Sequence, residues 1–67
     1  MITEEQAKKL RRGDKVHNIL WDEVWIVSIP YQKYGERWLV EVVKKGYMAG
    51  ISDLRMDEWE VKDANSI

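Results

Sequence analysis

A glycine–aspartate pair, Gly13-Asp14, divides this chain into two unlike parts. The part before it has the spacing of a short helix, and from Lys15 onward Val, Ile, Trp and Tyr dominate the sequence. β-branched and aromatic residues favour strands, whereas glycine beside aspartate favours a turn. The sequence therefore predicts a mostly β fold that a short helix precedes.

The size of the chain limits how it can be stabilised. Its 67 residues are expected to form one domain, 1–67, with a thin core. A chain of this length buries only about 60% of its unfolded surface, so large side chains must supply the burial. The sequence contains four tryptophans and three tyrosines but no phenylalanine. Because so small a core encloses few large rings, some of these rings are expected at the surface.

Composition argues against several classes of function. The absence of cysteine excludes disulfides and thiolate metal sites and agrees with a cytoplasmic protein. A formal net charge of −1 gives no bulk attraction to nucleic acid, and no apolar run suits a membrane. Acid–base catalysis would need the one histidine, His17, held by a carboxylate such as Asp14 or Asp22. We expect no enzymatic activity, no cofactor and no metal.

The N-terminal segment has the signals of a capped helix. Thr3 and Gln6 have the spacing of a capping box, and the acidic residues of the first turn suit the helix dipole. The predicted helix spans residues 2–12 and ends before Gly13. Its apolar side chains, which are expected to cover one open end of a barrel formed by the strands, are Ile2, Ala7 and Leu10.

Five short strands are expected after the helix. They span residues 14–20, 24–29, 37–44, 47–51 and 59–61. Pro30 is expected to end regular pairing of the second strand, since proline cannot donate to a ladder. Residues 31–36 then form a hairpin tip in which Gly35 can supply a positive φ. Ser52 and Asp53 resemble the cap of a single helical turn that contains Leu54.

The alternation of the strands predicts a core and an apolar outer surface. The expected core residues are Val16, Val27, Trp38, Val40, Val42, Ile51, Leu54 and Val61. The second strand is apolar on both faces, which suggests that another molecule covers the side of Trp25, Ile29 or Tyr31. That molecule is either a second copy of the chain or a different protein.

These elements describe a five-stranded SH3-like barrel with a short N-terminal α-helix and one helical turn before the last strand. The helix occupies 2–12, the barrel 14–62 and a tail 63–67. Arg12-Gly13-Asp14-Lys15-Val16 and Tyr47-x-x-Gly50-Ile51 resemble SH3-like families, among them the small SH3-like subunit of photosystem I and short bacterial and phage proteins. The likeness to the type II dihydrofolate reductases is more distant. Their Val-Gln-Ile-Tyr signature is absent, because Ala49-Gly50-Ile51-Ser52 occupies that place, so folate and nicotinamide binding are not carried over.

Two binding functions remain open. The first is a protein-interaction module, because aromatic and arginine side chains commonly anchor interfaces. Its predicted contact residues are Tyr31, Tyr34, Arg37, Tyr47 and Trp59. The alternative is a nucleic-acid-binding module similar to KOW and Tudor domains, with bases stacked on the tyrosines. The predicted phosphate contacts are Lys33, Arg37, Lys44 and Lys45.

Overall fold

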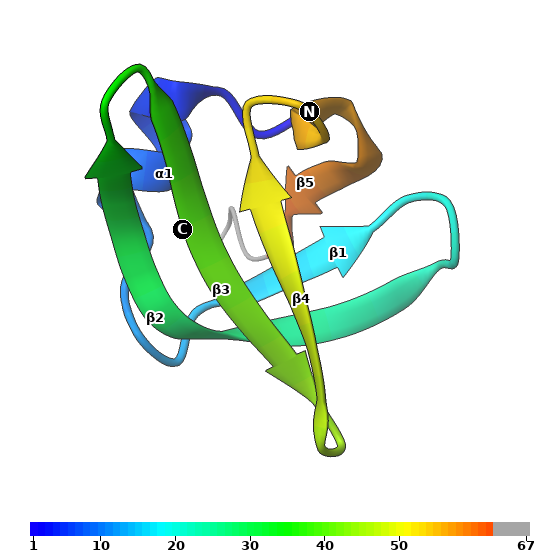
Figure 1. The fold of residues 1–67 in the computed structure, drawn as a ribbon. Coiled ribbons are helices and arrows are strands. Elements are labelled where there is room, and N and C mark those ends of the chain that lie inside the picture. Colours follow the sequence, from blue (N-terminus) through cyan, green and yellow to red (C-terminus); the bar gives the residue numbers. More distant parts are fainter. Residues whose placement is uncertain (63–67) are drawn as a thin grey trace.

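The computed structural model describes residues 1–62, and the predicted tail, 63–67, lies outside them. One α-helix is followed by five antiparallel strands and one 3-10 turn in the described part of the chain (Figure 1). The elements are α1 (Glu4–Lys9), β1 (Lys15–Asn18), β2 (Glu23–Tyr34), β3 (Arg37–Lys44), β4 (Tyr47–Ser52), η1 (Met56–Glu58) and β5 (Trp59–Val61). The helix is shorter than the predicted 2–12, because Leu10 is already extended and forms its C-cap. No helix within residues 1–62 is long and apolar enough to cross a membrane.

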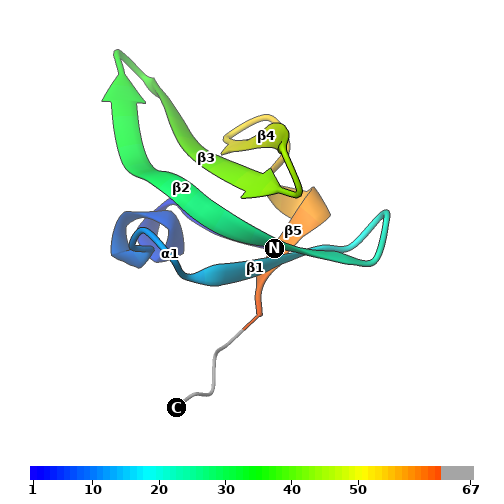
Figure 2. The same cartoon turned by 90° about the horizontal axis from the view of Figure 1, so that it is seen from below.

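The strands form one strongly curved sheet in the order β4-β3-β2-β1-β5 (Figures 1 and 2). The long strand β2 allows this curvature. Its first residues pair with β1, and from Ile26 onward it pairs with β3. As a result β4 and β5 are the two edge strands, and η1 leads the chain from one edge to the other.

The prediction that Pro30 ends regular pairing is wrong, because β2 continues through it to Tyr34. The register with β3 shifts between Val27 and Ile29 and again between Ile29 and Gln32. Pro30 lies within the second irregularity, where a missing N–H costs no ladder bond. The hairpin tip is consequently much shorter than the predicted 31–36.

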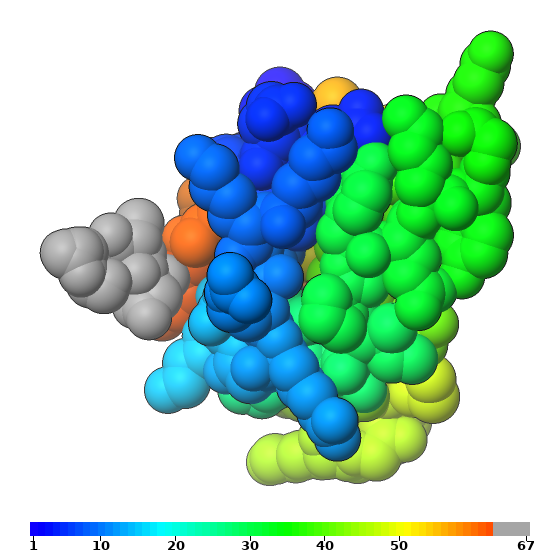
Figure 3. Space-filling model, turned by 90° about the vertical axis from the view of Figure 1, so that its left-hand side faces the viewer, coloured from blue at the N-terminus to red at the C-terminus, as the bar shows by residue number. Residues whose placement is uncertain are grey.

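The predicted capping box of the helix is confirmed. Thr3 accepts a hydrogen bond from the backbone N–H of Gln6 at 3.2 Å, and the Gln6 side chain accepts one from the N–H of Thr3 at 2.9 Å. The predicted cap of the helical turn is wrong, because η1 does not contain Leu54 and its N-cap, Arg55, makes no side-chain cap hydrogen bond. Gly35 adopts the expected positive φ, 67°. Ile2 and Ala7 are completely buried. Figure 3 shows the N-terminal segment packed beside the hairpin of β2 and β3.

Most of the predicted core is buried, with one clear exception. Leu54 is 70% exposed, because it lies in the turn before η1, where Ser52 Oγ accepts a hydrogen bond from its N–H. Val61 is only partly buried and packs against the core. The buried apolar residues are Ile2, Ala7, Leu10, Val16, Trp25, Val27, Trp38, Val40, Val42, Ile51 and Trp59.

The outer face of β2 offers less apolar surface than the sequence suggests. Trp25 points inward and is 5% exposed, and Tyr31 is half-buried. Ile29 remains 37% exposed. Of the three side chains expected under a covering molecule, only Ile29 therefore offers an open apolar surface.

Candidate functional site

An aromatic groove separates β4 from the turn between β1 and β2, residues 19–22. Its two halves have volumes of about 330 Å³ and about 400 Å³, within the usual range of ligand sites. Trp21, Trp25 and Ala49 border both halves, which makes the two a continuous depression. We call this depression the seam groove. It is lined mainly by Leu20, Trp21, Trp25, Tyr47, Ala49 and Trp59.

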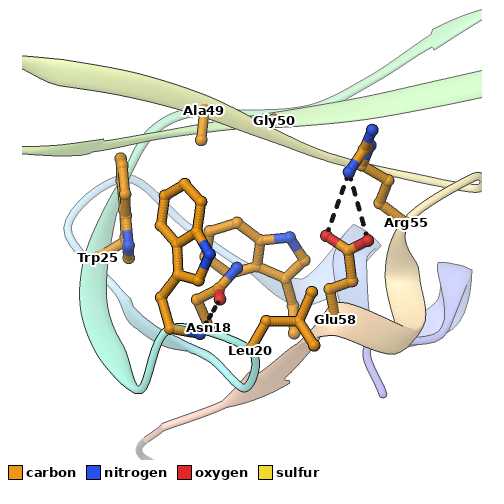
Figure 4. Close-up of a pocket in the computed structure, with 9 residues that line it drawn as sticks. Asn18, Leu20, Trp25, Ala49, Gly50, Arg55 and Glu58 are labelled. Atoms are coloured by element: carbon orange, nitrogen blue, oxygen red, sulfur yellow. Dashed lines mark hydrogen bonds and ion pairs between the residues drawn. The ribbon is translucent and has the colours of Figure 1, made fainter.

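Figure 4 shows how the elements surround the half nearer to η1. Ala49 and Gly50 of β4 lie on one side, and Asn18 and Leu20 lie on the other. Arg55 and the carboxylate of Glu58, which it contacts, form the end of this half opposite Trp25. The site is thus assembled from an edge strand, a turn and the segment around η1.

The turn of residues 19–22 holds Trp21 at the surface. The side-chain oxygen of Asn18 accepts a hydrogen bond from the backbone N–H of Trp21 at 2.9 Å. Asn18 is itself 7% exposed, and the N–H of Ile19 donates to the carbonyl of Glu58 at 2.8 Å. Because these bonds fix the backbone on both sides, the Trp21 side chain is presented to solvent, where it is 70% exposed.

His17 fastens the end of the same turn to β5. Its Nε2 lies 2.7 Å from Asp22 Oδ1, and its Nδ1 lies 2.8 Å from Glu60 Oε2. An ionised carboxylate only accepts hydrogen bonds, so both ring nitrogens donate and the imidazole is protonated in this arrangement. The bond to Asp22, followed by the bond to Glu60, raises the pKa of His17 above 6.5. His17 thus stabilises the turn that carries Trp21.

Trp25 forms a buried wall of the groove and has an unusual polar atom. Its ring meets that of Trp59 edge to face, with centroids 5.9 Å apart and an angle of 79° between the planes. The indole Nε1 of Trp25 is buried and has no hydrogen-bond partner within the described residues. An unsatisfied buried donor of this kind costs about 1–3 kcal/mol of stability.

Charged side chains border the groove at both ends. Lys44 pairs with Glu23 at 3.5 Å near the turn between β3 and β4. Arg55 pairs with Glu58 at 3.3 Å near η1. Lys45 is exposed beside the first pair, and no ion pair joins it to another residue of 1–62. The rim is therefore slightly cationic although the whole chain carries a formal net charge of −1.

The five predicted protein-contact residues do not form one surface. Tyr47 is 73% exposed and lines the groove, whereas Trp59 is 3% exposed and contributes only to its floor. Tyr34 is 57% exposed but lies at the far end of β3 beside Arg37. β3 has 8 residues, so its two ends are separated by roughly 23 Å at about 3.3 Å per residue.

Tyr31 has a structural role. Its ring stacks on Trp38 with centroids 5.9 Å apart, and its hydroxyl donates to Glu4 Oε2 at 2.6 Å. This bond to Glu4 is the main reason why the pKa of Tyr31 rises to about 12, and it also lowers the pKa of Glu4. Tyr31 thereby attaches α1 to β2 and is not free for stacking with a ligand.

The four predicted phosphate contacts are also separated and mostly paired. Lys33 lies 3.6 Å from Glu4, and Arg37 Nε lies 3.0 Å from Asp53 Oδ1. Lys44 pairs with Glu23, so Lys45 alone has no carboxylate partner within residues 1–62. Lys33 and Arg37 also lie at the opposite end of β3 from the two other lysines. The four cations therefore do not form one phosphate-binding surface.

Leu20 and Trp21 were not among the predicted contact residues. The predicted strand 14–20 is too long, because β1 ends at Asn18 and Leu20 lies in the following turn, where it is 67% exposed. The available signal was Trp21, because it lies between the predicted strands 14–20 and 24–29. Within residues 1–62, no three His, Cys, Asp or Glu side chains lie together so as to hold a metal ion.

Comparisons with protein-family models, with curated proteins and with solved structures found no match for this chain.

Proposed function

We propose that this protein is a non-enzymatic interaction module and that the seam groove binds a segment of a protein partner. The observation that carries this proposal is the exposure of Trp21, which is 70% accessible above an apolar groove. Tryptophan and tyrosine are enriched among the residues that dominate binding energies, and most of them insert into or border a pocket. Tyr47 provides the second such side chain on the opposite wall.

The position of Trp21 supports binding over a purely structural role. A side chain that is 70% exposed contributes little to the core, and yet its backbone is fixed by the buried side chain of Asn18. A backbone that is already ordered has little conformational entropy left to lose on binding, which favours affinity. The groove thus combines apolar area with an exposed tryptophan on an ordered backbone.

We also propose that the curved sheet is an SH3-like barrel. Its support is the placement of β5 beside β1, the bent strand β2 and the 3-10 turn before the last strand. In this proposal the seam groove is the gap that the two edge strands leave in the barrel.

Nucleic-acid binding is the alternative that the same experiment must separate. Phosphate contacts release counterions, so affinity for nucleic acid falls steeply as salt rises. An interaction that depends on apolar contacts with Trp21 and Tyr47 should change little between low and physiological salt. The paired state of Lys33, Arg37 and Lys44 favours the protein partner.

The test is selection of random linear peptides displayed on phage against the immobilised protein, followed by titration of a synthesised peptide. Trp21→Ala should weaken binding by at least about tenfold, as expected for an interface anchor. Leu54→Ala is the matched control, since Leu54 is equally exposed, at 70%, but does not line the groove. Equal binding by the wild type and Trp21→Ala would refute the proposal. Loss with Tyr34→Ala instead would place the contact at the tip of the β2–β3 hairpin.

A further inference from the structure

The side of β4 that borders the seam groove has backbone groups without partners in the sheet. The β3–β4 turn has two residues with φ of 48° and 87°, so the flanking pair, Lys44 and Tyr47, exchanges both hydrogen bonds. Pairs alternate along an antiparallel ladder, and Met48 and Gly50 therefore turn their N–H and C=O groups away from β3. The carbonyl of Ser52 has the same orientation, and it accepts a bond from outside the ladder at 3.0 Å.

This side of β4, at which the N–H and C=O groups of Met48 and Gly50 point away from β3, is the free edge of the sheet, and it lies next to the apolar walls of the groove. Side chains alternate between the two faces of a strand, so Tyr47 and Ala49 share the face of the buried Ile51, while Met48 lies on the outer face. A further strand beside β4 would direct every second side chain into the groove, toward Trp21. Its remaining side chains would lie on the outer face beside Met48, which is 67% exposed.

The charges that line the groove indicate what the added strand should carry. The lining charges are Lys44, Lys45 and Arg55 against Glu23 and Glu58, which leaves one positive charge in excess, at Lys45. An acidic side chain near that end of the groove would complement it.

We propose that the seam groove takes an extended, apolar-rich peptide segment of another protein as a sixth strand on β4, with an acidic residue beside Lys45. The segment pairs its backbone with Met48 and Gly50 and inserts an apolar side chain between Trp21 and Ala49. Strand addition of this kind obtains affinity from main-chain bonds and specificity from alternate side chains. This inference rests on the proposed function and adds the conformation and charge of the partner.

The experiment uses the peptide selected on phage and compares Met48→Pro with Met48→Ala. Proline at Met48 removes an N–H that faces the free edge and leaves the ladder with β3 intact, a position that edge strands tolerate. Met48→Pro should weaken binding by at least about tenfold, whereas Met48→Ala should retain affinity within about threefold. Circular dichroism establishes that both variants are folded. If Met48→Pro binds as the wild type does, strand addition is overturned, and loss with Trp21→Ala in the same assay still supports the groove as the site.

Two measurements on the peptide keep the inference testable if Met48→Pro does not fold. N-methylation of single peptide N–H groups should abolish binding at alternate positions, and equal binding by every methylated peptide would overturn strand addition. The selected sequences should have apolar residues at every second position, and helical or proline-rich spacing would also overturn it.

Lys45→Glu should weaken binding by about tenfold relative to Lys45→Gln, and equal affinities would remove the acidic residue from the proposal.

A second copy of the chain is the other occupant that this edge could accept. Sedimentation at high concentration should therefore show a monomer for the wild type. A dimer that Met48→Pro dissociates would assign the edge to self-association and overturn the proposed peptide partner.

Discussion

The contrast between Trp38 and Trp21 tests whether the sheet has its inner and outer faces assigned correctly. Trp38 is 3% exposed and stacks on Tyr31, whereas Trp21 is 70% exposed. A buried tryptophan removes roughly 150–250 Å² from water, which at about 25 cal/mol per Å² sets an upper bound of about 4–6 kcal/mol. Because an alanine at this position would still bury part of that area, Trp38→Ala should lower the free energy of unfolding by ~3–5 kcal/mol.

That loss is comparable to the whole stability expected for the domain. At about 0.05–0.15 kcal/mol per residue, a chain of 67 residues has roughly 3–10 kcal/mol in total. At the slope of about 1 kcal/mol per M expected for so short a chain, urea unfolding followed by circular dichroism should show a midpoint lowered by about 3 M or more for Trp38→Ala, or no folded baseline. Trp21→Ala should change the free energy of unfolding by less than about 1 kcal/mol. A cooperative transition of Trp38→Ala close to that of the wild type would refute the assignment of the faces.

Three further predictions concern local interactions. The raised pKa of His17 stabilises the fold fully below about pH 6.5, and this contribution is lost as pH rises through the folded-state pKa. As pH rises from about 5 to about 9, the urea midpoint of the wild type should thus decrease more than that of His17→Gln. Equal decreases in the two proteins would contradict the bonds to Asp22 and Glu60. Thr3→Ala should cost about 1 kcal/mol in thermal or urea unfolding, and Thr3→Ser should retain most of the wild-type stability, since serine caps helices as well. Gly46→Val should cost ~1–3 kcal/mol more than Gly46→Asn because φ is 87° there; equal stabilities of the two variants would contradict the turn geometry.

Features that depend on local sequence were predictable, and the third strand is the clearest example. Its expected limits, 37–44, agree with β3, because alternation of Trp38, Val40 and Val42 ends at a turn that Gly46 permits. The capping box at Thr3 is equally local. Pro30 was misread because the bulge that accommodates it depends on pairing with β3, which the residues around it do not reveal.

The site was only partly predictable, for a different physical reason. The surplus of aromatic rings correctly indicated that some are exposed, and Tyr47 was among the predicted contacts. Which tryptophan remains outside depends on how the sheet curves: it turns Trp59 into the core beside Trp25 and leaves Trp21 in a turn. Long-range packing of this kind leaves no periodic signal in the sequence.

The most direct test of the seam groove as the binding site is a two-dimensional NMR titration of the indole N–H groups with the selected peptide. The chain has four tryptophans, so each signal can be assigned with a single Trp→Phe variant. We expect the Trp21 signal to shift most, the Trp25 signal to move as well because Trp25 lines the groove, and the Trp38 signal to stay in place. Saturable binding that shifts Trp38 and leaves Trp21 and Trp25 unchanged would contradict this expectation.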